Sequence, residues 1–152
     1  MKAAFYETLI RQAEALLADE DDLIAAMANF SALINDNLQD LNWAGFYIVK
    51  NGQLVLGPFQ GKVACTRIEF GKGVCGTAAA LNITQRVADV HQFDGHIACD
   101  AASNSEIVVP VRQNGQVIAV LDIDSPLLNR FDEDDQVGIE LLVKQFENCL
   151  FG

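Results

Sequence analysis

The chain has 152 residues, of which 51% are hydrophobic and 20% are charged, and its formal net charge is −11. A chain of this length can bury roughly two-thirds of its unfolded surface in one core, so we expect a single folded domain over residues 1–152. The strong negative charge repels phosphate backbones and anionic lipid headgroups. It therefore argues against nucleic acid and membrane surfaces as partners.

The N-terminal segment lacks the pattern of an export signal. Residues 1–17 are amphipathic and contain Glu7 and Glu14, and no apolar run approaches the roughly 20 residues that a membrane span needs. We therefore expect a cytoplasmic protein. Because cytosolic thiols stay reduced unless they cycle, the four cysteines are expected to serve chemistry or core packing rather than a disulfide framework.

Two helices are predicted at the start of the chain. Residues 2–18 carry apolar side chains at steps of three and four, which indicates a helix with one buried stripe. The stripe consists of Phe5, Leu9, Ala13, Leu16 and Leu17. A second helix is expected to begin at Asp21 and Asp22, which suit an N-cap, and to run to Leu38. We expect the pair to form an antiparallel helical layer.

A change to extended structure follows these helices. Residues 43–49 are rich in aromatic and β-branched side chains, which predicts a strand. Asn51 and Gly52 form a strong hairpin signal, so residues 53–56 are expected to return as an antiparallel strand. Residues 66–70 alternate in polarity and predict a further strand.

The middle of the chain is expected to form shorter helices and strands. A turn is marked by Gly71, Gly73 and Gly76. We predict a short helix over residues 77–81 and a short strand over residues 86–90. Residues 91–105 show no period and predict an irregular loop, and loops of this length are usually functional or mobile.

The C-terminal part predicts a second hairpin and a last helix. Strands over residues 106–112 and 116–124 flank the turn residues Asn114 and Gly115. A helix over residues 132–149 begins with four acids and is expected to turn one side to the core. Its inward residues are predicted to be Val137, Leu141, Leu142 and Phe146. This order of elements predicts an α+β sandwich in which helices back an antiparallel sheet.

Acidic residues occur inside the otherwise apolar second strand of this hairpin. Asp122 and Asp124 are two residues apart, so both should project to the same face of the sheet. Acids at such positions are most often solvated. Within so apolar a strand, however, they predict an inward polar cluster.

Four segments are distinctive as motifs. They are Trp-Ala-Gly-Phe-Tyr at 43–47, Gly-Lys-Gly-Val-Cys-Gly-Thr-Ala at 71–78, His-Ile-Ala-Cys-Asp at 96–100 and Val-Leu-Asp-Ile-Asp-Ser at 120–125. Together they resemble the free methionine-R-sulfoxide reductase family, whose members are single GAF domains. The resemblance covers nearly the whole chain and is weakest in the two N-terminal helices. It implies reduction of free L-methionine-R-sulfoxide to L-methionine without a cofactor.

The resemblance implies a role for three of the cysteines. Cys99 matches the family's nucleophile, and attack on the sulfoxide would leave it as a sulfenic acid. Cys65 and Cys75 match the candidates to resolve that acid as a disulfide, which thioredoxin would then open. We favour Cys65, with Cys75 as an alternative or second relay. Cys149 matches no motif and is expected to pack as a small hydrophobe.

The acids and aromatic residues are implied to form the substrate pocket. Crowding of Glu106, Asp122 and Asp124 should raise the pKa of at least one of them, so that it can protonate the departing oxygen. The same charge opposes a Cys99 thiolate unless protonation or loop amides relieve it. Trp43 and Tyr47 would border the methyl sulfoxide and the polar end of the substrate. The loop amides of Ile97, Ala98 and Cys99 would hold its carboxylate.

Two alternatives stay open. A zinc site could be built from Cys65, Cys75, His91, His96 and Cys99, but these lack the short Cys-x-x-Cys pairing of common structural sites, so we expect no metal. The fold alone would also permit a non-catalytic GAF sensor of a small ligand or of redox state. A sensor is expected to need an output domain, for which a chain that ends at Gly152 leaves no room. The outer face of the N-terminal helices is a candidate homodimer surface.

Overall fold

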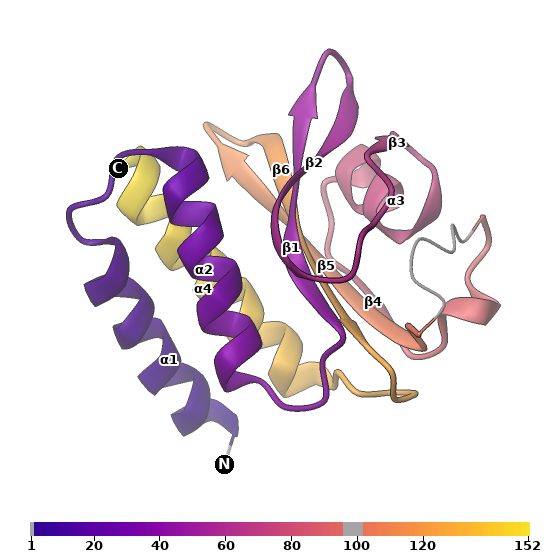
Figure 1. Cartoon of the computed structure of the whole chain (residues 1–152), viewed down its shortest axis with the longest axis horizontal. Helices are drawn as coiled ribbons and strands as arrows, with labels where there is room; N and C mark the ends of the chain where they lie inside the picture. Colours follow the sequence, from indigo (N-terminus) through magenta and orange to yellow (C-terminus); the bar gives the residue numbers. More distant parts are fainter. Residues whose placement is uncertain (1, 96–101) are drawn as a thin grey trace.

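The computed structural model describes residues 2–95 and 102–152. Within these residues six strands form one antiparallel sheet in the order β3-β2-β1-β6-β5-β4. The strands are β1 (Trp43–Lys50), β2 (Gln53–Gly61), β3 (Arg67–Glu69), β4 (Gln85–Val87), β5 (Ser105–Gln113) and β6 (Gln116–Ser125). Figure 1 shows the helices α1, α2 and α4 on one side of this sheet and the shorter α3 on the other. The predicted α+β architecture is confirmed.

Both predicted hairpins are present. Asn51 and Gly52 have φ values of 53° and 78°, and Asn114 and Gly115 have φ values of 54° and 79°. Successive positive φ angles are what a two-residue hairpin turn of the favoured hand requires. The first hairpin therefore joins β1 to β2, and the second joins β5 to β6.

Strand β2 continues five residues beyond its predicted end at residue 56. The prediction stopped there because Gly57 and Pro58 are rare inside strands. Pro58 is tolerated because β3 pairs only with Gln53, Leu54 and Val55, so no partner on that side requires the missing amide. The extension brings Phe59 opposite Gly45 on β1.

Helix α3 (Gly73–Leu81) begins four residues before the predicted residue 77. Gly73 and Gly76 were assigned to a turn, but both lie within the helix. Gly76 lies inside the helix because α3 approaches β3 closely there, and a Cβ atom would lie 2.4 Å from the backbone oxygen of Glu69. The predicted strand at residues 86–90 is also shorter, and a 3-10 turn (Val90–Gln92) opens the segment that was predicted to be irregular.

The helical side differs from the prediction in which helices pack together. α2 (Leu23–Asn37) and α4 (Glu133–Phe151) lie on the sheet, whereas α1 (Lys2–Leu17) packs mainly against α4 rather than forming a layer with α2. The N-cap role of Asp22 is confirmed by a 2.8 Å bond from the Ala25 amide. The core between these helices and the sheet includes Phe30, Phe46 and Phe146.

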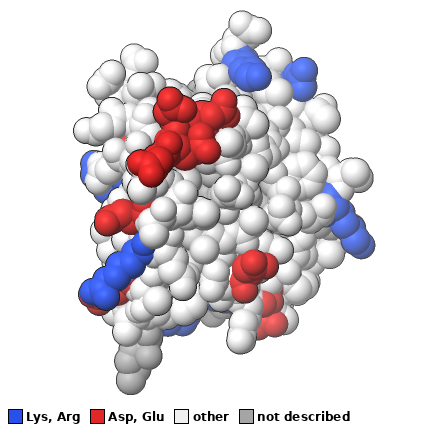
Figure 2. Space-filling view, turned by 60° about the vertical axis from the view of Figure 1, so that its left-hand side comes forward, with Lys and Arg blue, Asp and Glu red and all other residues white. Residues whose placement is uncertain are grey.

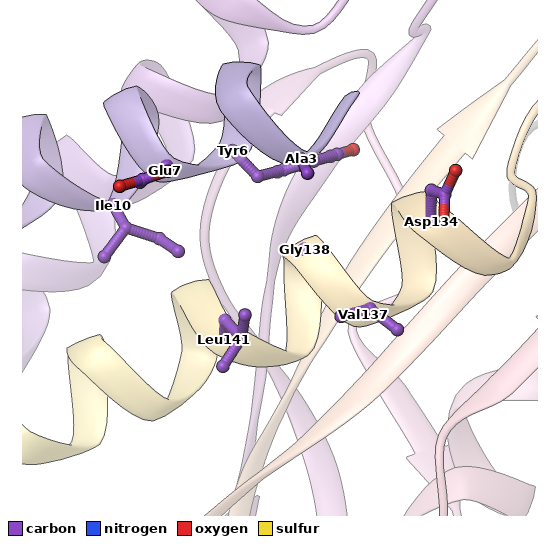
Figure 3. A pocket seen from close by; sticks show the side chains of 8 residues that line it. All are labelled: Ala3, Tyr6, Glu7, Ile10, Asp134, Val137, Gly138 and Leu141. Carbon is purple, nitrogen blue, oxygen red and sulfur yellow. The ribbon is translucent and has the colours of Figure 1, made fainter. Parts of the chain in front are cut away.

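The position of α1 changes which of its side chains are buried. Leu9, Ala13 and Leu17 are buried as predicted, but Phe5 and Leu16 are 39% and 43% exposed, and Tyr6 is buried instead. On α4, Leu142 and Phe146 face the core, whereas Val137 and Leu141 are 53% and 52% exposed. The predictions for Phe5, Leu16, Val137 and Leu141 are therefore wrong. Val137 and Leu141 instead line a groove between α1 and α4 (Figure 3).

A polar anchor fixes α1 to the start of α4. The Tyr6 hydroxyl donates to Asp135 Oδ1 at 2.7 Å, and Lys2 Nζ lies 2.8 Å from Asp135 Oδ2. The ring of Tyr6 rests on Gly138, where a Cβ atom would come within 2.2 Å of the Tyr6 Cγ. Gly138 therefore permits the two helices to approach closely.

Gly138→Ala is expected to lower the free energy of unfolding by about 1–3 kcal/mol, because a methyl group must displace a buried aromatic ring. Chemical denaturation monitored by circular dichroism measures this change. Lys144→Ala is the control, since Lys144 is an exposed position of the same helix and should change stability by less than about 0.5 kcal/mol. Equal stability of the Gly138→Ala and Lys144→Ala variants would contradict the close contact.

The surface of the helical side is unevenly charged. Figure 2 shows one large acidic patch on this side, with smaller acidic groups and basic side chains separated by uncharged surface below it. Four consecutive acids, residues 19–22, lie between α1 and α2. Among the helices described, none combines the length and apolar character that a bilayer crossing requires.

Candidate active site

The predicted pocket residues of β1, β5 and β6 lie on the same face of the sheet. Trp43 pairs with Asp124, and Asp124 in turn pairs with Glu106. Asp122 lies opposite Gly45 on one side and Val108 on the other. Because side chains alternate along a strand, this register turns all the acids toward the side of the sheet that α3 covers. The shared face predicted for Asp122 and Asp124 is confirmed.

The three acids are buried rather than solvated. Glu106 is 8% exposed, Asp122 is 5% exposed and Asp124 is 7% exposed. Helix α3 adds the buried thiol of Cys75, whose Sγ lies 4.0 Å from Glu106 Oε2. Cys75 Sγ and one oxygen each of Glu106 and Asp122 all lie within 4.8 Å of one another. The prediction of an inward polar cluster is confirmed, and it includes a thiol.

This cluster holds negative charge in a desolvated place. Burial and the neighbouring Asp122 and Asp124 raise the pKa of Glu106 well above its ordinary value. Burial, Asp122 and Glu106 likewise raise the pKa of the Cys75 thiol. Neither Glu106 nor Asp122 forms an ion pair with another described residue. The arrangement therefore favours a protonated Glu106, which is the state that a proton donor needs.

An aromatic wall stands beside the acids. The Trp43 ring stacks on Tyr47 at 5.9 Å between ring centres and on Phe59 at 5.0 Å. Trp43 and Tyr47 were expected in the pocket from resemblance, whereas Phe59 was missed because the predicted strand ended before it. Its apolar ring, two residues after Gly57, was the only sequence signal.

Both polar atoms of this wall bond to the backbone that follows β2. Trp43 Nε1 donates to the carbonyl oxygen of Lys62 at 3.1 Å, and the Tyr47 hydroxyl donates to the carbonyl oxygen of Cys65 at 2.9 Å. Burial raises the pKa of Tyr47, so its hydroxyl keeps the proton that it donates. The two rings thus hold the segment that carries Cys65 against the pocket face.

The cysteines differ in redox state and surroundings. Cys65 is disulfide-bonded, whereas Cys75 and Cys149 carry free thiols. Cys149 packs at the edge of the helical core, as predicted. Cys99, Ile97, Ala98 and His96 lie outside the described residues. Of the described members of the zinc alternative, only Cys75 belongs to a group whose geometry suits a metal ion.

Comparisons with known proteins show the family and the fold. The GAF domain family matches residues 20–150. The chain is 56% identical to the free methionine-R-sulfoxide reductase of Escherichia coli K12, over 98% of this chain and 90% of that protein. It is 46% identical to the free methionine-R-sulfoxide reductase of Neisseria meningitidis, solved in complex with its substrate, with a TM-score of 0.94 and coverage of 98% and 90%. A solved structure described as a putative GAF sensor protein from Burkholderia vietnamiensis is 56% identical, with a TM-score of 0.96 and coverage of 99% and 96%.

Proposed function

The chain belongs to the GAF-domain family of free methionine-R-sulfoxide reductases, and from this premise we propose that it reduces free L-methionine-R-sulfoxide to L-methionine. The observation that carries the proposal is the buried cluster of Glu106, Asp122 and Asp124 beside an aromatic wall. Such a cluster is costly to bury unless a cation or a proton compensates it. A free amino acid supplies the cation as its ammonium group. We propose that the single domain spans residues 1–152.

The proposed substrate contacts follow from the chemistry of the pocket. Asp122 Oδ1 is buried and accepts no hydrogen bond from the described residues, so it is suited to receive the ammonium group. The ring of Trp43 offers an apolar, polarizable surface for the methyl group on sulfur. Loop amides at Ile97 and Ala98 would bind the substrate carboxylate. A peptide-bound methionine sulfoxide has neither terminal charge and should bind poorly.

In the proposed reaction the Cys99 sulfur attacks the sulfoxide sulfur. Glu106 protonates the sulfoxide oxygen, and oxygen transfer leaves methionine and a Cys99 sulfenic acid. The Cys65 thiol then attacks the sulfenic sulfur, which expels water and forms a Cys65–Cys99 disulfide. Two electrons and two protons from thioredoxin restore both thiols. We propose the cytoplasm as the location, because this recycling requires a reducing compartment.

Cys65 is the proposed resolving residue in preference to Cys75. It is already oxidised to a disulfide in this structure, whereas Cys75 and Cys149 carry free thiols. Cys75 is buried against carboxyls that raise its pKa, and a thiol is a poorer nucleophile than a thiolate. Both features support Cys65.

The proposal is tested with resolved stereoisomers and a dithiol reductant. Free L-methionine-R-sulfoxide should be turned over, while the free S-sulfoxide and a peptide-bound R-sulfoxide should not. The description of the Burkholderia vietnamiensis relative raises a sensor as the second candidate function. Binding of the R-sulfoxide without any methionine formation would favour the sensor and contradict the reductase.

Tyr47→Phe tests whether the aromatic wall positions Cys65. The variant keeps the ring that faces Trp43 and loses the bond to the Cys65 carbonyl. We expect methionine release in a single turnover to change little, but disulfide formation to slow by about tenfold, which corresponds to one hydrogen bond of about 1.4 kcal/mol. Rapid quenching with a thiol label measures both steps. Equal slowing of both steps would instead indicate that the hydroxyl contacts the substrate.

A homodimer through the α1–α4 groove is also proposed. The groove has a volume of about 310 Å³, and Figure 3 shows Ile10, Val137 and Leu141 along it. A two-fold interface is self-complementary, so the exposed Val137 and Leu141 of one copy would fill the groove of the other. Light scattering should give twice the mass of one chain, and Leu141→Glu should reduce the measured mass to that of a single chain.

A further inference from the structure

The buried cluster contains a thiol that the proposed reaction leaves unused. Cys75 is 5% exposed, and its Sγ shares a space less than 4.8 Å across with oxygens of Glu106 and Asp122. These atoms come from three separate elements, α3, β5 and β6. A thiol beside two carboxyls, gathered by the fold rather than by a local turn, is a donor set that suits a metal ion.

The second observation is a carboxylate oxygen in the same space that accepts no hydrogen bond from the described residues. Asp122 is only 5% exposed, and its Oδ1 atom accepts no hydrogen bond from the described residues. No Lys or Arg among these residues forms an ion pair with Glu106 or Asp122. Buried carboxyls without a cationic partner require a proton or a cation. The substrate ammonium meets this need only while substrate is bound.

We propose that the substrate-free protein binds a thiophilic divalent cation, with Zn²⁺ as the physiological type, through Cys75, Glu106 and Asp122. The sulfur ligand selects against Mg²⁺ and Ca²⁺, which take oxygen ligands. Three protein ligands leave a fourth position for water. The ion occupies the space of the substrate ammonium and acts as an inhibitor rather than a cofactor. This last step, competition, rests on the proposed function.

The test uses the protein in its oxidised form with Co²⁺ as the probe. Because Cys65 is then in a disulfide, Cys75 and Cys149 are the free thiols of the described chain. We expect Co²⁺ to produce a sulfur-to-cobalt charge-transfer band in the near ultraviolet. Cys75→Ala should lose the band, and the matched control Cys149→Ala should keep it. Absence of the band in the unmodified chain, its survival in Cys75→Ala or its loss in Cys149→Ala would overturn the proposal.

Asp122→Asn provides a second variant that keeps the thiol. It should weaken Co²⁺ binding on the order of tenfold or more, since one anionic ligand is lost, and unchanged affinity would remove Asp122 from the site. Free methionine-R-sulfoxide should abolish the band. A band that persists at saturating substrate would contradict the proposal that the ion and the substrate ammonium occupy the same space. Cobalt binding is measured without turnover. Its failure would therefore leave the reductase proposal standing, and failure of the activity assay would leave the cation site standing.

Discussion

Replacing Cys99 with serine is expected to abolish turnover of free methionine-R-sulfoxide, to below about 10⁻⁴ of the unmodified rate. A serine hydroxyl is a far weaker nucleophile toward sulfur than a thiolate, and it cannot form the sulfenic acid on which the next step depends. The remaining pocket can still bind substrate, so the loss should appear in kcat rather than in the dissociation constant. Methionine formation with excess dithiothreitol measures the rate.

Two further cysteine variants make this result specific. Cys149→Ser should retain full activity, because Cys149 packs at the edge of the helical core. Cys65→Ser should release about one methionine per chain and then fail to turn over with thioredoxin. Retained turnover in Cys99→Ser would contradict the mechanism and make Cys75 the next nucleophile to test.

The parts of the site that the sequence predicted are those fixed by local rules. The turn at Asn114 and Gly115 joins β5 to β6, but it does not by itself place Glu106, because the register shifts by one residue along the hairpin before Glu106 pairs with Asp124. Strand alternation then turns Asp122 to the same face. The spacing along one strand was therefore sufficient to predict the shared face of Asp122 and Asp124, whereas the place of Glu106 depends on the register shift and was expected only from resemblance.

The parts that were not predicted depend on contacts between distant segments. Helix α3 brings Cys75 against the acids, and this approach requires that Gly76 has no side chain facing β3. Phe59 reaches Trp43 only because β2 runs past Pro58. Tyr6 is buried because α1 packs on α4, which periodicity within α1 alone does not specify. The role of Cys99 stays a prediction from resemblance.

Glu106→Gln is expected to reduce kcat by a factor of about 10²–10⁴, because glutamine keeps the shape of the side chain but cannot donate a carboxyl proton. Burial beside Asp122 and Asp124 raises the pKa of Glu106, so the acid is charged only at higher pH. Turnover in the unmodified chain should therefore fall as pH rises through the pKa of the folded protein. The residual activity of the variant should lack that decline. Glu69→Gln, at an exposed position on β3, is the control and should match the unmodified profile.

The raised pKa of Glu106 also makes the free energy of unfolding depend on pH. Between the ordinary pKa of a glutamate, 4.5, and the raised folded value, the folded chain holds a proton that the unfolded chain releases. The free energy of unfolding therefore decreases as pH rises through this window, and the Glu106 contribution is fully present only below it. Glu106→Gln does not titrate, so its melting temperature should fall less between pH 4.5 and pH 8 than that of the unmodified chain. An unchanged slope would mean that Glu106 ionises freely in the fold, and it would then be a poor proton donor at neutral pH.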